Sequence, residues 1–171
     1  MEHASDVVIR SYEPGDLEGC RRLWHALTQH HRDIYEDPRI GGENPGRYFD
    51  EYLKHPKYSA SWVAVRGQEI VGLTGLLVDG DEGEVEPVVV APPHRRQGIG
   101  RLLLDFAIEQ AREQGLGSVK IRPVARNAEA MRHFHAAGFQ VLGHVEMFQS
   151  LRLTTQAWEP GITIHDLDFR Q

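Results

Sequence analysis

The sequence predicts a single α+β domain over residues 1–171, and three observations support that prediction. A length of 171 residues is typical of one domain and is enough to bury a substantial core. Short apolar β-type runs are interspersed with segments of helical period, and turn residues separate them. Residues 88–101 join an apolar run, a basic turn with two glycines and the start of an amphipathic helix. A strand that enters a helix in this way presents N–H groups and the positive end of the helix dipole, which predicts an anion site, most often for phosphate.

The chain is expected to begin with a short strand and a long helix. Residues 7–11 form a β-type run that Pro14-Gly15 stops. Asp16 is the expected N-cap of a helix that extends to about Tyr35. The apolar positions of this helix recur at helical spacing and are Leu17, Cys20, Leu23, Trp24 and Leu27.

A second helix is expected after a loop over residues 37–42. It starts near Asn44, and Pro45 occupies a first-turn position where its missing N–H does no harm. His55-Pro56 ends it, because the residue before a proline is disfavoured in a helix. This segment carries several aromatic side chains, which give it an apolar side.

Three strands are expected in the middle of the chain. Residues 61–65 and 70–78 form a hairpin with a turn near Gly67, and Gly72 and Gly75 within it indicate a bulge or a close approach of backbones. A third strand covers 84–90, where the continuous valines imply burial on both faces. Pro87 interrupts this third strand and cannot donate to a ladder, so an irregular pairing is expected close to it.

The remaining segments continue the alternation of helices and strands. The helix after the glycine turn ends at Gly115 and Gly117, and a strand over 118–122 is halted by Pro123. Asn127 is a good N-cap for a last helix that Gly138 closes. Residues 139–142 and 145–151 have the pattern of a final hairpin, and the tail from 155 to 171 alternates enough to add an edge strand.

Composition and charge limit the classes of function. The formal net charge of −6 argues against broad electrostatic binding to nucleic acid, although a local basic patch remains at Arg95, Arg96 and Arg101. No apolar run is long enough for a transmembrane helix, and the acidic first residues do not resemble a secretory signal. The single cysteine, Cys20, suits a reducing compartment, so a cytoplasmic protein that binds neither membrane nor nucleic acid is expected.

Three kinds of phosphate loop compete for residues 95–100. A nucleoside-triphosphate loop requires a lysine followed by serine or threonine after its last glycine, and none is present. A dinucleotide fingerprint requires a third glycine where this chain has Leu103, and an acidic residue about 20 positions on, near Lys120. The third kind fits, because Arg95-Arg96-Gln97-Gly98-Ile99-Gly100 matches the Q/R-x-x-G-x-G/A loop of the GCN5-related N-acetyltransferases (GNATs).

The chain resembles the GNAT superfamily over most of its length. The valine strand before the loop, Asn127 at the start of the last helix, and residues 134–139 at its end follow the order and spacing of that family. The resemblance implies a mixed, strongly twisted central sheet with helices on both faces and a splayed strand pair that holds acetyl-CoA. It also implies an acyltransferase that moves an acetyl group to a primary amine by direct attack of that amine.

The resemblance assigns residues to the co-substrate acetyl-CoA. The pantetheine arm would pair like a strand with Val88 and Val90, and the pyrophosphate would lie on the N–H groups from Arg96 to Arg101. The residues expected to contact acetyl-CoA are Val88, Val89, Val90, Arg95, Arg96, Gln97, Gly98, Ile99, Gly100, Arg101, Asn127 and Phe134.

The resemblance also suggests the acid–base groups. Glu86 precedes the first pantetheine-pairing valine by two residues and is the expected general base, directly or through water; Glu84 shares its side of the strand and is the reserve. The family often has a tyrosine that protonates the leaving thiolate, and here that position is Phe134. Water, an unprotonated leaving thiolate, or Tyr48 or Tyr52 remain as alternatives.

The acceptor is expected to bind at the first two helices and the loop between them. Candidate residues are Trp24, His31, Tyr35 and Tyr48, which are aromatic or basic side chains in a region that also carries acids. A small molecule, a peptide N-terminus and a lysine side chain all remain possible acceptors, and the protein is expected to be a monomer or a homodimer. The ten histidines show no metal-ligand spacing, so no metal is expected.

Two other classes of function remain open at this point. One is a catalytically silent acyl-CoA-binding or regulatory module, which the missing tyrosine favours. The other is a nucleotide-binding switch, which predicts that ATP or NAD stabilises the protein against heat better than CoA does.

Overall fold

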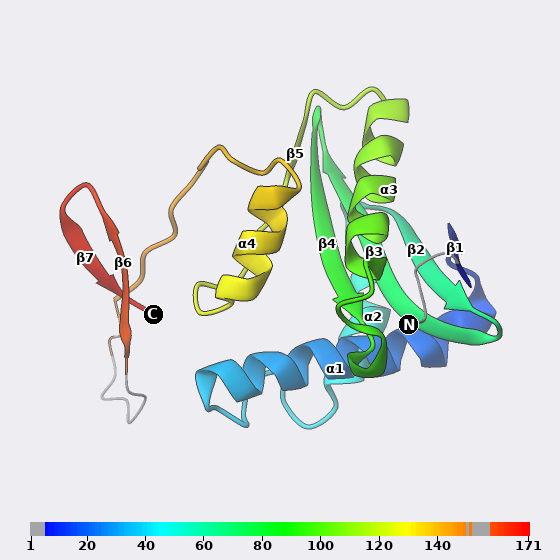
Figure 1. Cartoon of the computed structure of the whole chain (residues 1–171), viewed down its shortest axis with the longest axis horizontal. Helices are drawn as coiled ribbons and strands as arrows, with labels where there is room; N and C mark the ends of the chain where they lie inside the picture. The colour runs from blue at the N-terminus through cyan, green and yellow to red at the C-terminus, as the bar shows by residue number, and fades with distance from the viewer. Residues whose placement is uncertain (1–5, 150, 152–157) are drawn as a thin grey trace. The chain divides into compact units, whose positions relative to one another are not determined.

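The computed structural model describes residues 6–149, 151 and 158–171, and these form two compact units. Unit 1 is Met1–Arg122 and unit 2 is Pro123–Gln171, and each is described by itself (Figure 1). The single domain expected over residues 1–171 stays a prediction. No helix among the described residues is both long and apolar enough to cross a membrane.

Unit 1 contains a five-stranded sheet with the strands in sequence order. The strands are β1 (Val7–Ser11), β2 (Tyr58–Arg66), β3 (Glu69–Asp79), β4 (Glu82–Val90) and β5 (Ser118–Lys120). The first four pair antiparallel, and β4 pairs parallel with β5. The predicted strands of this unit are thereby confirmed, although β5 is shorter than expected.

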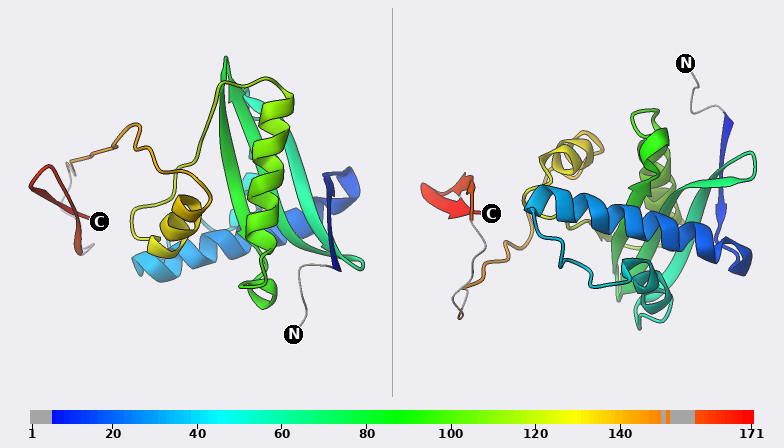
Figure 2. Two further views of the ribbon diagram at one scale, coloured as in Figure 1. Left: turned by 45° about the horizontal axis from the view of Figure 1, so that its top comes forward. Right: turned by 90° about the horizontal axis from the view of Figure 1, so that it is seen from below.

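Helices cover both faces of the sheet (Figure 2). The helix α1 (Leu17–Tyr35) ends at the predicted residue, and the second helical segment is a 3₁₀ turn (Pro45–Arg47) that leads into the short α2 (Tyr48–Tyr52). These pack on one face, where Cys20, Leu23, Phe49 and Tyr52 form a core with Leu73, Leu77 and Val89 of the strands. The helix α3 (Ile99–Glu113) covers the other face, where Leu103 packs with Ala64 and Val71. The mixed, helix-flanked sheet of the predicted α+β fold class is confirmed.

Two glycines of β3 allow close approach, as the sequence predicted. A Cβ on Gly72 would lie 2.8 Å from a methyl carbon of Leu103, so α3 packs directly on the backbone of β3 there. A Cβ on Gly75 would collide with the Tyr52 hydroxyl and lie 2.9 Å from the Glu86 carbonyl oxygen. Gly75 therefore makes room for α2 and for the irregular part of β4.

The start of α1 differs from the prediction in one respect. Asp16 occupies the N-cap position, but its side chain makes no capping hydrogen bond to α1. Its carboxylate instead accepts two hydrogen bonds from the Arg10 guanidinium, at 2.6 and 2.8 Å, and one from the Glu13 N–H at 2.8 Å. A nearby guanidinium is a stronger partner for a carboxylate than a neutral amide, so the ion pair prevails over the cap.

The predicted irregularity at Pro87 is a β-bulge. Thr74 pairs with Val88 and Leu76 pairs with Val85, so two residues of β4 face the single Gly75 of β3. The extra residue reverses the alternation of side chains along β4. In a regular strand Glu84 and Val89, five residues apart, would lie on opposite faces. Because of the bulge, both lie on the α1 face.

Unit 2 begins with the predicted helix and then departs from the prediction. The Asn127 side chain accepts a hydrogen bond from the Ala130 N–H at 3.0 Å, which caps α4 (Ala128–Ala136) as expected. Residues 139–149 and 151 contain no strand, so the predicted hairpin is wrong for these residues; residue 150 lies outside the described part. Apolar side chains in this stretch are exposed, such as Val141 and Phe148, and strands require cross-strand neighbours that are not present here.

The C-terminal tail forms a hairpin and not a single edge strand. The strands β6 (Pro160–Ile164) and β7 (Leu167–Arg170) pair antiparallel in a sheet of their own. His165 and Asp166 both have positive φ, at 53° and 62°, and form the turn between them. Such conformations suit a two-residue hairpin loop. The part of the predicted edge strand at residues 155–157 lies outside the described residues.

Candidate active site

The turn between β4 and α3 has the backbone geometry of an anion-binding loop. A 3₁₀ turn over Pro92–His94 follows β4, and α3 begins at Ile99 after Gly98 at the N-cap position. Arg96 and Gly98 have positive φ, at 63° and 87°. A left-handed residue ahead of a helix start directs successive N–H groups toward one side, which is the arrangement that holds phosphates. A non-glycine residue in this conformation is uncommon, and such backbone strain is concentrated at functional sites.

Side chains brace this loop against the sheet. The Arg66 guanidinium of β2 donates to the Gln97 side-chain oxygen at 2.9 Å and lies 3.0 Å from His94 Nδ1. Gln97 in turn donates to the Pro93 carbonyl at 3.3 Å, and Arg95 donates to the Val90 carbonyl at 3.1 Å. Two of the predicted loop contacts, Gln97 and Arg95, therefore shape the loop with their side chains.

One edge of β4 is open beside the loop. The strand β5 pairs only with Glu82, Gly83 and Glu84, while β3 occupies the other edge of β4 as far as Val90. Among the described residues of unit 1, the edge from Glu86 to Val90 therefore has no neighbouring strand, as the splayed pair predicts. Val88 and Val90 are half-buried, whereas the Val89 side chain is buried in the core against α1. An extended ligand at this edge would meet Val89 through its backbone only.

A pocket of about 350 Å³ lies on the α1 face of unit 1 and includes residues of β4. Its lining combines aromatic, acidic and basic side chains. The residues are Trp24, Tyr48, Glu51, Tyr52, His55, Lys57, Leu77, Glu84, Glu86 and Arg122. Of the predicted acceptor residues it includes Trp24 and Tyr48, together with both predicted candidates for the base.

Glu86 is the pocket carboxylate with the raised pKa. Glu86 is an exposed residue of β4, but partial loss of hydration of its carboxylate is the largest cause, and the charge of Glu84 adds to it, while Arg122 and His55 act in the opposite direction. A carboxyl group whose pKa is raised holds a proton more readily, and this brings it closer to the range useful for proton transfer near neutral pH. The electrostatics are thus compatible with the predicted role of Glu86 as a general base.

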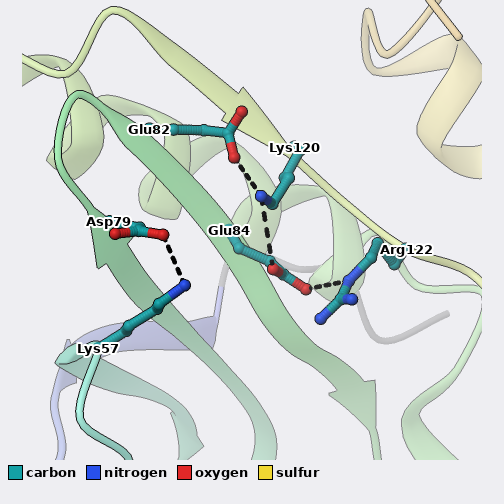
Figure 3. Close-up of polar contacts among 6 residues, drawn as sticks. All are labelled: Lys57, Asp79, Glu82, Glu84, Lys120 and Arg122. Atoms are coloured by element: carbon teal, nitrogen blue, oxygen red, sulfur yellow. Dashed lines mark hydrogen bonds and ion pairs between the residues drawn. The ribbon is translucent and has the colours of Figure 1, made fainter. Parts of the chain in front are cut away.

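Glu84 is held in an ion-pair network between β4 and the end of β5 (Figure 3). Its carboxylate accepts a hydrogen bond from Arg122 Nε at 2.5 Å and lies 4.0 Å from Lys120 Nζ. Lys120 also pairs with Glu82, which lies two residues before Glu84 on β4. The carboxylate of Glu84 is already engaged by Arg122 and lies near Lys120, whereas that of Glu86 is not paired among the described residues, so the geometry favours Glu86 over Glu84 as the base.

The two tyrosines of α2 differ in their access to the pocket. The Tyr52 hydroxyl is buried against Gly75, and burial, followed by the charge of Glu86, raises the pKa of Tyr52. Tyr48 is 44% exposed and lines the same pocket. Of the two, Tyr48 is the hydroxyl that a bound ligand could reach.

Several predicted site residues lie elsewhere. His31 and Tyr35 belong to the last turns of α1 and are not among the pocket residues. Burial, followed by the charge of His30, lowers the pKa of His31, which favours its neutral form. Asn127 and Phe134 belong to unit 2, where Asn127 caps α4 and the Phe134 ring lies 6.4 Å from that of Phe139.

Sequence reasoning missed five pocket residues, which are Glu51, His55, Lys57, Leu77 and Arg122. Glu51 and His55 follow Tyr48 in the segment predicted to bind the acceptor, so their proximity could have indicated them. Nothing local marks Arg122, because its position depends on how β5 pairs with β4. Among the described residues no group of three or more histidine, cysteine, aspartate or glutamate side chains could hold a metal ion.

Comparisons with known proteins agree with this geometry. A sequence profile of the acetyltransferase (GNAT) family matches residues 24–139. Streptothricin acetyltransferase of Streptomyces lavendulae is 39% identical over 163 aligned residues, which cover 82% of this chain and 85% of that protein.

Two solved structures share the fold. A transcriptional regulator from Bacillus halodurans C-125 has a TM-score of 0.64 at 26% identity, over 84% of this chain and 99% of that chain. AAC(6′)-Iy in complex with the bisubstrate analogue CoA-S-monomethyl-acetylneamine has a TM-score of 0.63 at 17% identity, over 84% of this chain and 97% of that one. The chain belongs to the GNAT family of acetyltransferases, which use acetyl-CoA, and its activity is the transfer of an acetyl group to an amine.

Proposed function

We propose that this protein acetylates a primary amine of a small cationic molecule and that the pocket on the α1 face is its acceptor site. The observation that carries the proposal is the position of Glu86, which lines an aromatic and acidic pocket and also adjoins the open edge of β4. The relative from Streptomyces lavendulae is a streptothricin acetyltransferase, so streptothricin is the first acceptor to test.

The chain offers acetyl-CoA two complementary surfaces. The backbone of Val88 and Val90 lies at the edge that β5 leaves open, so a pantetheine amide could pair there as a strand would. The N–H groups from Arg96 to Arg101 surround the start of α3, where a pyrophosphate would be stabilised by hydrogen bonds and by the helix dipole. Together these surfaces support the assignment of acetyl-CoA as co-substrate.

The acceptor pocket suits an ammonium group. The rings of Trp24 and Tyr48 offer faces that attract cations. Among the described residues, Glu86 and Glu51 make no ion pair within 4 Å, whereas Lys57 is paired with Asp79 at 2.5 Å and Arg122 with Glu84. The two unpaired carboxylates are therefore available to a positively charged acceptor.

The proposed reaction proceeds by direct attack. Glu86 removes a proton from the bound ammonium, directly or through one water, and leaves a neutral amine. The amine nitrogen attacks the thioester carbonyl, a C–N bond forms, the C–S bond breaks, and the thiolate of CoA leaves. Water or Tyr48 supplies the proton to the thiolate, since Phe134 has no hydroxyl. Orientation of the two substrates accounts for the largest share of the rate.

Thiol release from acetyl-CoA, measured across an amine panel, tests the proposal. The panel includes streptothricin, an aminoglycoside and a peptide with a free N-terminus. We expect amine-dependent thiol release, with the product one acetyl group heavier by mass spectrometry. Saturable binding of acetyl-CoA without turnover on any amine would contradict the proposal and favour a silent acyl-CoA-binding module.

Two further properties remain part of the proposal. The buried Cys20 is the chain's only cysteine, and burial raises the pKa of its thiol to about 12, so it is suited neither to a disulfide nor to nucleophilic attack. This supports a cytoplasmic enzyme without an acyl-cysteine intermediate. A monomeric or homodimeric state stays a prediction.

A further inference from the structure

The acceptor pocket contains two carboxylates on the same strand. Glu84 and Glu86 are two residues apart on β4, and both line the pocket. The rise of a strand separates their Cα atoms by about 7 Å. Glu84 is paired with Arg122 and lies 4.0 Å from Lys120 Nζ, whereas Glu86 makes no ion pair within 4 Å among the described residues. The pocket thus has two negative positions that differ in what compensates their charge.

The two partners in the Glu84–Arg122 pair are held very differently. Glu84 is 12% exposed, and its backbone is fixed by pairing with Leu77 on one side and Lys120 on the other. Arg122 is 67% exposed and lies beyond the last paired residue of β5. A mostly buried carboxylate requires a cation to compensate its charge. An exposed arginine at a strand end adds little free energy as the partner, so another cation can replace it.

We propose that Glu84 is a second ammonium subsite and that acceptors with two amines displace Arg122 from it. One amine binds Glu84 as an ammonium ion, while the other gives its proton to Glu86 and is acetylated. This inference rests on the proposed function, because it assigns a substrate class to the same pocket. The exchange replaces one cation with another, so the charge compensation of Glu84 is preserved.

The spacing of the two glutamates along β4 selects the length of the acceptor. Extended 1,4-diaminobutane places its nitrogens about 6 Å apart, which is close to the spacing of the two glutamates. Its methylene groups would lie against the rings of Trp24 and Tyr48, which line the same pocket. A monoamine of equal length would reach Glu86 but leave the Glu84–Arg122 pair intact.

The test compares 1,4-diaminobutane with 1-aminobutane in the thiol-release assay. We expect the native protein to prefer the diamine by about tenfold or more in kcat/KM, as a charge-assisted hydrogen bond would provide. Glu84→Gln should abolish that preference when the two amines are compared at the same pH. Arg122→Gln should act in the opposite direction and lower KM for the diamine, because it removes the cation paired most closely with Glu84 and leaves only Lys120 at 4.0 Å. Glu82→Gln is the matched control, since Glu82 lies on β4 like Glu84 and pairs with Lys120, but does not line the pocket.

Calorimetric titration of 1,4-diaminobutane in the presence of CoA separates this inference from the proposed function. Diamine binding that depends on Glu84, without thiol release, would support the subsite and contradict the acetyl transfer. Equal kcat/KM for the two amines in the native protein, or a preference that Glu84→Gln retains, would overturn the subsite and leave the acetyl transfer in place. A melting curve of each variant shows that it is folded, and the opposite effect expected of Arg122→Gln does not depend on the stability of the Glu84 variant.

Discussion

Replacement of Glu86 by glutamine should reduce acetyl transfer most strongly at low pH. The amide keeps the shape of the side chain but cannot accept the proton of the ammonium group. Loss of a general base reduces rates by about 100- to 10,000-fold, or about 2.7–5.4 kcal/mol at 1.36 kcal/mol per tenfold change. The deficit should shrink as the pH approaches the pKa of the amine, because the acceptor then arrives already neutral.

The neighbours of Glu86 determine where the acid limb of the native profile falls. The base acts only when deprotonated, so kcat/KM should fall as the pH drops through the raised pKa of Glu86. Glu84 raises that pKa and Arg122 lowers it. Glu84→Gln should therefore move the acid limb to lower pH, and Arg122→Gln should move it to higher pH. These shifts apply to a monoamine acceptor, which does not bind at Glu84.

The assay is thiol release from saturating acetyl-CoA with 1-aminobutane between pH 5.5 and pH 10. A melting curve provides the control for folding. Because the raised pKa shows that the fold disfavours the charged form of Glu86, the stabilisation by its protonated form is lost as the pH rises through that pKa. A neutral glutamine should consequently not lower the melting temperature at neutral pH. Equal activity of the native protein and Glu86→Gln at every pH would refute the role of this residue.

Three further changes test other parts of the account. Asp16→Asn removes the ion pair with Arg10 and should lower the free energy of unfolding by about 1–3 kcal/mol in urea titration, with Glu18→Gln at an exposed position as the control. Because Arg10 lowers the pKa of Asp16, this difference should be present at neutral pH and should vanish as the pH falls through that lowered pKa. Gly75→Ala places a Cβ against the Tyr52 hydroxyl and 2.9 Å from the Glu86 carbonyl oxygen, so it should lower the free energy of unfolding by about 1–3 kcal/mol. It should also reduce kcat more than it raises KM for acetyl-CoA. Gly15→Ala, with open space around it, should change neither stability nor kinetics. Arg66→Gln removes the brace on the phosphate loop and should raise KM for acetyl-CoA several-fold with a smaller change in kcat; an unchanged KM would show that the loop is rigid without it.

Local patterns were enough to predict most of unit 1. The valine run and the helix-period segments depend on burial of one face or both, and the structure contains the corresponding strands and helices. Pro87 and Gly75 were correctly assigned to an irregular pairing because each restricts what a strand can do. What Pro87 does to the alternation of β4 depends on the partner strand, and no local pattern predicts it.

The errors arose where a residue depends on a distant partner. The stretch after Gly138 has a strand pattern, but β-propensity reflects packing against neighbouring strands, and among the described residues no strand lies beside the exposed Val141 and Phe148. Asp16 was expected to cap α1 and is engaged by Arg10. The sequence does not predict the contact of Arg122, because this residue donates a hydrogen bond to Glu84 at a sequence separation of 38 residues. The family resemblance indicated Glu86 as the candidate base and residues 95–101 as the candidate phosphate loop, and both stay predictions; it did not indicate pocket residues such as Arg122.

A crystal structure of the protein with CoA and 1,4-diaminobutane tests the central claim most directly. The account predicts pantetheine along the backbone of Val88 and Val90, the pyrophosphate at the start of α3, and one diamine nitrogen within about 3 Å of the Glu86 carboxylate or joined to it by one water. CoA bound away from the open edge of β4, or an amine bound outside the pocket that contains Glu86, would contradict it.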